Sequence, residues 1–357
     1  MTMTIDLKIQ ELISNLKEIS REKNLKTGFI IGNTAKKNNN SESFTTPVRV
    51  YSNIVVAGVI IYSDSDIPKV CKLLDGKLDY IFVDAEKKIP NVSNPNETVN
   101  IERKARELIK KSIFLTYKGN DLTVESVDIH LSYIFKENVR GIGGKNISVI
   151  GAGNLGSKLA LKLAERGANV ILFRRNKKKL NSIIEALNYI KPKETESKIY
   201  ASGSINEAIK LSDIVLVTAD NSNVISKESI KFIQPHTIFF DIGKGTIAPE
   251  VISFLTNNNN SFFRADVSSA MAGMLESNLM LDEVLTNRLG RRNFHGIPIV
   301  SGGLIGKSGE FIVDNVNDPK VIYGIAAGDG LFKEKISRDD QIVFDTLKSL
   351  IAKNVKE

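Results

Sequence analysis

Residues 146–156 read Asn-Ile-Ser-Val-Ile-Gly-Ala-Gly-Asn-Leu-Gly, and this stretch decides the fold. The apolar run 147–150 predicts a short strand, and Gly151, Gly153 and Gly156 follow it at the spacing G-x-G-x-x-G. Apolar residues then recur at helical spacing, so the glycines lie between a strand and a helix. Strand, tight turn and helix in this order favour a dinucleotide-binding unit over a purely structural glycine turn.

Each glycine of this turn has a distinct role. Gly151 permits the sharp turn, Gly153 lets a pyrophosphate approach the backbone, and Gly156 lets the helix lie close to the strand. Free N–H groups and the helix dipole then face the phosphates. We therefore expect the cofactor to contact the turn itself, namely Gly151, Ala152, Gly153, Asn154, Leu155 and Gly156.

The end of the following strand indicates which dinucleotide binds. Val170 to Phe173 predicts that strand, and Arg174 and Arg175 come directly after it. An NAD site usually has an acidic residue here to accept from the ribose 2′-OH, whereas arginine pairs with the 2′-phosphate of NADP. No carboxylate occurs between residues 168 and 181. The arginine pair predicts NADP as the cofactor, and the alternative is a solvated basic turn in a lysine-rich protein.

Strands and helices are expected to alternate on both sides of the glycine motif. Three apolar runs that precede the motif predict strands, at 54–62, 79–84 and 113–117. About six more strands are predicted from the motif onward, and the first of them is the strand of the motif itself. The expected fold class is α/β, with a doubly wound parallel Rossmann sheet, a smaller α/β substrate domain before it and a C-terminal helical segment. The corresponding domain boundaries are 1–143, 144–266 and 267–357. The last part contains a Gly-rich loop at 301–309 and a closing helix.

The ligand crevice of a doubly wound sheet lies at the carboxyl ends of its strands. Thr218, Ala219 and Asp220 follow one predicted strand, and residues 241–244, which include Gly243, follow the next. We expect Thr218, Ala219 and Gly243 to border the nicotinamide ring.

Composition narrows the possible partners. The net charge of +8 comes from dispersed lysines without aromatic-basic repeats, which argues against nucleic acid as a partner. No apolar run approaches the length of a membrane span, and the first residues lack the hydrophobic region of a signal peptide, so a cytoplasmic protein is expected. One cysteine, Cys71, and three scattered histidines offer no metal-ligand spacing. The oligomeric state stays open, and a homodimer is one option.

From about Tyr117 to Gly245 the chain resembles the shikimate/quinate dehydrogenase-like group, which includes methylenetetrahydrofolate dehydrogenases and glutamyl-tRNA reductases. Gly119-Asn120-Asp121 stands where shikimate dehydrogenases have Gly-Asn-Thr-Asp, and Arg175 matches the phosphate-binding arginine of members that use NADP. The resemblance implies that Asp121 is the acid of a catalytic pair. The Pro-x-Lys segment that supplies the family's lysine is missing, so Lys118, Lys87 and Lys88 remain alternative candidates.

Two further segments bear on this resemblance. Ser301 to Gly306 is similar to a Pro-Gly-Gly-Val-Gly segment that borders the cofactor in methylenetetrahydrofolate dehydrogenases. Glutamyl-tRNA reductases use a cysteine, but Cys71 lies inside a predicted helix with nothing nearby to activate a thiolate. The polar stretch 36–43 predicts a mobile loop, for which a surface insertion and a lid are the alternatives.

These features predict an NADP-dependent oxidoreductase. A small polar substrate would bind in the cleft between the first domain and the nucleotide domain and exchange a hydride with the nicotinamide. An Asp-Lys pair would manage the single proton. One alternative is a cofactor-binding regulatory protein without turnover, and another is a basic protein that binds nucleic acid nonspecifically.

Overall fold

The computed structural model describes residues 4–34, 42–89 and 97–354. The chain forms two compact units, residues 1–274 and 275–357. The first unit contains a five-stranded and a six-stranded sheet, and the second contains a four-stranded sheet. The expected fold class is confirmed: the chain is α/β, and both sheets of the first unit are built mainly from parallel strands.

The five-stranded sheet has the order β2-β3-β1-β4-β5. Its strands are β1 (Lys26–Asn33), β2 (Phe44–Val50), β3 (Ile54–Ile61), β4 (Tyr80–Asp84) and β5 (Ile113–Tyr117). All neighbours run parallel except β2, which is antiparallel to β3. Strands β1, β3 and β4 are buried almost throughout, and their apolar side chains contribute to one core.

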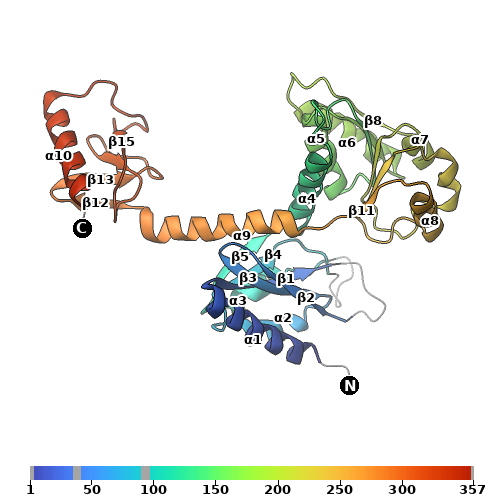
Figure 1. Ribbon diagram of the computed structural model, residues 1–357, viewed down its shortest axis with the longest axis horizontal. Helices are drawn as coiled ribbons and strands as arrows, with labels where there is room; N and C mark the ends of the chain where they lie inside the picture. The colour runs from blue at the N-terminus through green and yellow to red at the C-terminus, as the bar shows by residue number, and fades with distance from the viewer. Residues whose placement is uncertain (1–3, 35–41, 90–96, 355–357) are drawn as a thin grey trace. The chain divides into compact units, whose positions relative to one another are not determined.

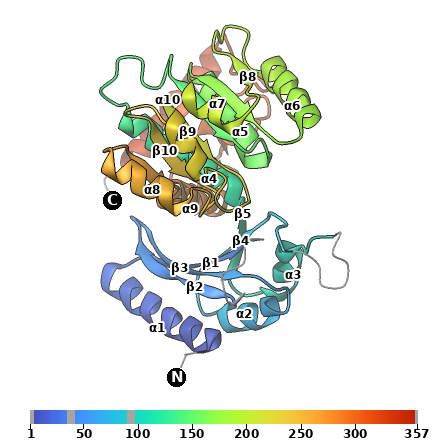
Figure 2. The same ribbon diagram turned by 90° about the vertical axis from the view of Figure 1, so that its right-hand side faces the viewer.

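Three helices share a core with this sheet: α1 (Ile5–Lys23) and α2 (Asp66–Leu74), which lie below it in Figure 2, and α3 (Ile101–Leu108), which lies beside it. In α1 the buried residues Ile9, Ile13 and Leu16 recur at helical spacing and face the core. Cys71 lies in the same core, and burial raises the pKa of its thiol to about 12. This side chain is therefore a packing residue, as its place in a predicted helix indicates.

The six-stranded sheet has the order β11-β10-β9-β6-β7-β8, and all its neighbours are parallel. Its strands are β6 (Asn146–Ile150), β7 (Asn169–Phe173), β8 (Ile199–Ala201), β9 (Ile214–Val217), β10 (Ile238–Asp241) and β11 (Phe262–Arg264). Counted from β6, this is the doubly wound order 3-2-1-4-5-6. The order reverses between β6 and β9, which is where a ligand crevice is expected.

Helices cover both faces of this sheet and enclose two apolar cores. One core includes α4 (Gly119–Ile134), α5 (Asn154–Glu165) and α6 (Lys177–Ile190). The other includes α7 (Ile205–Lys210), η1 (Lys227–Phe232) and α8 (Pro249–Asn257). The segment η1 is a 3₁₀-helix.

The second unit begins within α9 (Ser268–Glu283), which continues into a π-helical turn, η2 (Val284–Arg288). Its sheet consists of β12 (Arg291–Phe294), β13 (Ile297–Ser301), β14 (Phe311–Val313) and β15 (Ile322–Ile325), in that order. The final helix, α10 (Arg338–Asn354), packs Leu347 and Ile351 into the core of this unit.

Two parts of the fold were not predicted. The edge strand β2 is mostly half-exposed and contains Pro47, so it lacks the apolar signal of its neighbours. The four strands of the second unit are three to five residues long, and only a helical segment with a Gly-rich loop was expected there. The predicted loop at 36–43 lies, up to residue 41, outside the described residues.

Candidate functional site

The three glycines of the turn differ in the space around them. Gly151 has a φ of +118°, which only glycine adopts readily, and a side chain there would meet Thr218 at 2.9 Å. A Cβ on Gly156 would lie 2.1 Å from the carbonyl oxygen of Gly151, so α5 approaches the turn too closely for any side chain. A Cβ on Gly153, by contrast, would have nothing within 4 Å. The space in front of Gly153 is free for a ligand.

A cavity of about 520 Å³ opens on one side of this turn, at the ends of β6, β7 and β9. It is lined by Gly151, Ala152, Gly153, Phe173, Arg174, Arg175, Asn176, Thr218, Ala219 and Asp220, among others. Arg174 donates from Nη1 to the carbonyl of Ala152 and so holds the turn. Arg175 is exposed and forms no hydrogen bond or ion pair with any described residue. Its guanidinium is therefore available to a phosphate.

A second cavity, of about 750 Å³, opens on the other side of the turn. The carboxyl ends of the five-stranded sheet supply one wall and the glycine turn supplies the other; the lining residues with polar or aromatic side chains are Asn33, Thr34, Phe44, Tyr62, Lys88, Asn120, Thr123, Asn154, Thr218, Asp220 and Lys244. Leu155, Gly156 and Gly243 complete the wall beside the turn. Gly153, Thr218 and Asp220 line both cavities. A ligand that crosses the glycine turn would reach both.

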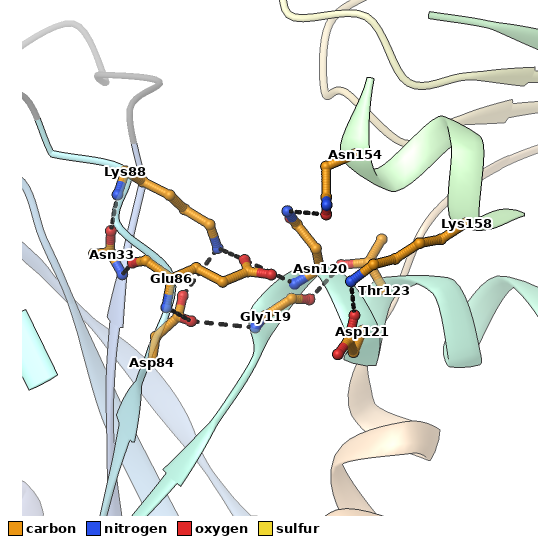
Figure 3. A network of polar contacts seen from close by, with 10 residues as sticks. All are labelled: Asn33, Asp84, Glu86, Lys88, Gly119, Asn120, Asp121, Thr123, Asn154 and Lys158. Atoms are coloured by element: carbon orange, nitrogen blue, oxygen red, sulfur yellow. Dashed lines mark hydrogen bonds and ion pairs between the residues drawn. The ribbon is translucent and has the colours of Figure 1, made fainter. Parts of the chain in front are cut away.

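Lys88 lies in the loop after β4 and lines the second cavity, and two carboxylates hold its ammonium group (Figure 3). Its Nζ lies 2.9 Å from Asp84 Oδ2 and 2.8 Å from Glu86 Oε2. The side chain of Asp84 is 2% exposed and that of Lys88 24% exposed. Two of the three ammonium donors are thus used, and one remains for a substrate oxygen.

The backbone around Lys88 fixes this arrangement. Asn33, the last residue of β1, donates from Nδ2 to the carbonyl of Glu86 at 2.9 Å and accepts from the N–H of Lys88 at 3.1 Å. Asp84 Oδ1 accepts from the N–H groups of Glu86 and Gly119, at 3.0 and 3.2 Å. Because β1 and β4 are parallel neighbours, Asn33 and Asp84 lie close together at the carboxyl ends of these strands.

Burial and charge act in opposite directions on this pair. Burial raises the pKa of Asp84, and the attraction of Lys88 offsets that effect only in part. Burial lowers the pKa of Lys88, but its contacts with Asp84 and Glu86 outweigh this and raise the pKa above its ordinary value. Lys88 is therefore an ammonium ion at neutral pH and can donate hydrogen bonds.

A chain of hydrogen bonds connects Lys88 to the glycine turn (Figure 3). Glu86 Oε2, which pairs with Lys88, also accepts from the N–H of Asn120 at 3.1 Å. Asn120 in turn donates from Nδ2 to Asn154 Oδ1 at 3.3 Å. Asn154 is the first residue of α5, directly after Gly153. Hydrogen bonds thus connect the loop after β4 to the start of α5.

The other predicted catalytic residues lie elsewhere. Asp121 pairs with Lys158 of α5 rather than with Lys118, and their side chains are 49% and 37% exposed. Neither Asp121 nor Lys118 is among the described residues that line the second cavity. Lys87 and Lys118 are exposed. Of the three candidate lysines, the structure brings Lys88 to the glycine turn.

Asp121 belongs to a row of ion pairs between α4 and α5. Glu125 pairs with Lys162 one helical turn further on, and Asp128 pairs with Arg166 after that. Residues four apart lie on the same helix face, so these pairs form a ladder along the contact of the two helices. This position gives Asp121 a structural role in joining α4 to α5.

Sequence reasoning overlooked Asn33, Asp84 and Glu86 as site residues. Asn33 and Asp84 each end an apolar strand, and a polar residue at that position is the signal that would have found them. Glu86 carries no such signal, because it lies in the loop after β4. Its role depends on the contact with the N-terminus of α4.

Comparison with known proteins gives a match centred on the six-stranded sheet. Residues 146–263 match the family model "NAD-dependent glycerol-3-phosphate dehydrogenase N-terminus". A glycerol-3-phosphate dehydrogenase [NAD(P)+] of Bacillus velezensis is 26% identical over 106 residues, which are 28% of this chain and 31% of that protein. The enzyme of the same name from Clostridium botulinum (strain Eklund 17B) is 33% identical over 104 residues, 28% of this chain and 32% of its own. The matched region contains the predicted dinucleotide-binding motif.

The match thus spans about a third of the length of these relatives. It excludes residues 1–145 and with them Lys88 and its partners. Among solved structures, L-tryptophan dehydrogenase from Nostoc punctiforme is 13% identical, with 72% of this chain and 75% of that chain covered, at a TM-score of 0.42. A similarity of that size supports no inference about function.

Within the described residues, none of the helices is long and apolar enough to cross a membrane. The same part of the chain has no group of three or more His, Cys, Asp or Glu side chains arranged to hold a metal ion.

Proposed function

We propose that this protein is an NADP-dependent oxidoreductase whose substrate binds beside Lys88. One observation carries the proposal: two cavities meet at the glycine turn, where they share Gly153, Thr218 and Asp220. An unpartnered arginine lies in one cavity and a held lysine in the other. A dinucleotide across the turn would place its 2′-phosphate in the first cavity and its nicotinamide in the second.

The residues of the first cavity fit the cofactor. The open space at Gly153 and the N-terminus of α5 suit the pyrophosphate, and Arg175 suits the 2′-phosphate. The match of residues 146–263 to a dehydrogenase family supports a nicotinamide dinucleotide over other ligands of this fold. When bound, the cofactor supplies or accepts the hydride. Thr218, Ala219 and Gly243 are the expected neighbours of its ring.

Lys88 is the group proposed to handle the proton. Its third ammonium donor is directed to a substrate oxygen, and a charged donor there stabilises negative charge that develops during reduction. Asp84 and Glu86 hold the ammonium in place and maintain its charge. Asp121, the acid implied by the resemblance to shikimate dehydrogenases, is assigned to the α4–α5 ladder instead.

We further propose that residues 1–143 form the substrate domain, 144–266 the nucleotide domain and 267–357 a C-terminal extension. The match to these relatives indicates no substrate for this chain, because the residues around Lys88 lie outside the matched region. The resemblance to the shikimate dehydrogenase-like group, from about Tyr117 to Gly245, stays a hypothesis.

The test is the transfer of a labelled hydride. The full chain is incubated with NADPH deuterated at nicotinamide C4 and a panel of small aldehydes and ketones, and products are analysed by mass spectrometry. The proposal predicts deuterium on a product carbon and loss of NADPH absorbance at equal rates. Tight NADPH binding with no transfer to any panel member would instead favour a regulatory protein without turnover.

A further inference from the structure

The charge pattern around Lys88 bears on the kind of molecule that can bind there. The charged side chains that line the second cavity, among the described residues, are Lys88, Asp220 and Lys244. Asp84 and Glu86 pair with Lys88, so three carboxylates and two ammonium groups lie at this cavity. The net charge of these groups is therefore slightly negative before any ligand binds.

The ammonium of Lys88 is already compensated. A phosphate or carboxylate that approached its free donor would also approach the two carboxylates that hold it, at 2.9 and 2.8 Å from the same Nζ. Like charges at such short range repel strongly in a partly buried site. Lys88 can therefore donate a hydrogen bond to a neutral oxygen without electrostatic repulsion, whereas Asp84 and Glu86 repel an anion.

Proteins also bind anions at helix N-termini, and the N-terminus of α4 is already occupied by side chains of the protein. The N–H groups of Gly119 and Asn120 open α4 toward the cavity, and they donate to Asp84 Oδ1 and Glu86 Oε2. The protein's own carboxylates thus fill the positions that a phosphate would take. The packing is close, since a Cβ on Gly119 would lie 2.9 Å from Lys88 Nζ and 3.0 Å from Asp84 Oδ2.

Apart from Lys88, Asp220 and Lys244, the side chains that line the second cavity are uncharged. Asn120 and Thr123 offer an amide and a hydroxyl on one side, and Phe44, Ile60 and Tyr62 form an apolar wall on the other. No arginine occurs among the described residues that line this cavity, whereas Arg174 and Arg175 line the first. Arginine is the usual partner for phosphate, so the two cavities differ in the charge they accept.

We propose that the substrate beside Lys88 is an uncharged hydroxy-aldehyde or hydroxy-ketone, or the corresponding polyol, rather than a phosphate ester or a carboxylate. This inference rests on the proposed function. In the reduction, a hydride from the nicotinamide cofactor adds to the carbonyl carbon and the π electron pair moves to oxygen. The oxygen takes a proton through Lys88, which solvent reprotonates; the substrate is reduced and the cofactor oxidised.

Matched pairs of substrates test the proposal. The full chain with NADPH is assayed with dihydroxyacetone against dihydroxyacetone phosphate, and with D-glyceraldehyde against its 3-phosphate; hydroxypyruvate represents the carboxylates. The expected kcat/KM is at least about tenfold higher for each neutral member than for its charged counterpart. A preference for the phosphate esters or for hydroxypyruvate overturns the proposal.

A variant tests the cause of the preference. Glu86→Gln removes one of the two carboxylates at Lys88, and it should shift the ratio of kcat/KM toward the phosphate ester by about tenfold while the Kd for NADPH stays unchanged. Glu125→Gln, which neutralises a carboxylate paired with Lys162 in the helix ladder, is the matched control and should leave the ratio as it is. Equal ratios in all three proteins would refute the electrostatic argument.

Failure of the inference and failure of the proposed function give different results. If NADPH binds but no neutral member is reduced, the substrate class is wrong and the cofactor assignment stands. If NADPH does not bind, the proposed function itself fails. Should Glu86→Gln not fold, as judged by its melting temperature, the substrate pairs on the unmutated protein still decide the substrate class.

Discussion

The glycine turn gives the sharpest prediction, because two of its glycines respond to a side chain in opposite ways. Gly153 has an extended backbone, with φ −95° and ψ −162°, that any residue can adopt. A Cβ there would have nothing within 4 Å. A Cβ on Gly156 would lie 2.1 Å from a backbone oxygen. Gly153→Val should therefore fold normally, whereas Gly156→Ala should be destabilised.

The magnitudes follow from these distances. Gly153→Val exposes its side chain to the cavity, so the free energy of unfolding should change by no more than about 0.5 kcal/mol. The valine occupies the place of the pyrophosphate and removes one or two charge-assisted hydrogen bonds, each worth about 1.5–3 kcal/mol. A loss of about 3 kcal/mol weakens NADPH binding roughly a hundredfold. Gly156→Ala forces the backbone apart and should cost about 1–3 kcal/mol of stability.

Calorimetric titration with NADPH and thermal denaturation, on both variants and the unmutated protein, separate the two effects. The expected pattern is lost binding with an unchanged melting temperature for Gly153→Val, and a lowered melting temperature for Gly156→Ala. An NADPH Kd for Gly153→Val within about threefold of the unmutated value would refute the assignment of the turn to the pyrophosphate.

Three further predictions concern single side chains. Arg175→Ala should weaken NADPH binding about ten- to a hundredfold and leave NADH binding unchanged in the same titration, because one charge-assisted phosphate contact is lost. Lys88→Met should reduce kcat about 10²–10⁴-fold with an unchanged NADPH Kd. Asp121→Asn should keep its kcat and lose at most about 1 kcal/mol of stability, since its ion pair is half exposed. A collapse of kcat in Asp121→Asn would restore the catalytic role that the resemblance implies. Asp75→Ala should lower the free energy of unfolding by about 1–2 kcal/mol near pH 7 by urea titration, because its carboxylate accepts from the N–H groups of residues 110–112. Burial raises the pKa of Asp75, but these hydrogen bonds outweigh it and hold the pKa below 3.8, so the contribution is present above pH 3.8 and is lost as the pH falls further; a difference from the unmutated protein that stays constant to pH 2 would contradict this.

The nucleotide-binding half could be predicted from sequence because its signals are local. A tight turn with φ above zero at Gly151, and a close helix approach at Gly156, each demand glycine within a few residues of a strand. Arg174 and Arg175 follow the next strand directly, so the chain itself brings them to the turn. The doubly wound order then follows from the alternation of strands and helices.

The surroundings of Lys88 could not be predicted in the same way, because their contacts join distant segments. Asn33 and Asp84 meet only because β1 pairs with β4, and Glu86 reaches Lys88 and the start of α4 at once. Lys118 was one of three candidate partners for Asp121, from which it is three residues away in sequence. In the helix, however, Asp121 faces α5 and pairs with Lys158. The strands of the second unit were missed because each is too short for an alternating pattern to emerge.

The most direct test of the central claim is the relative affinity of the unmutated chain for NADPH and NADH, measured by calorimetric titration under identical conditions. The glycine turn and Arg175 predict that both bind and that NADPH binds at least about tenfold more tightly, as one charge-assisted contact of about 1.5 kcal/mol or more requires. Equal affinities would contradict the assignment of Arg175 to the 2′-phosphate. Absence of binding by either would contradict the account as a whole.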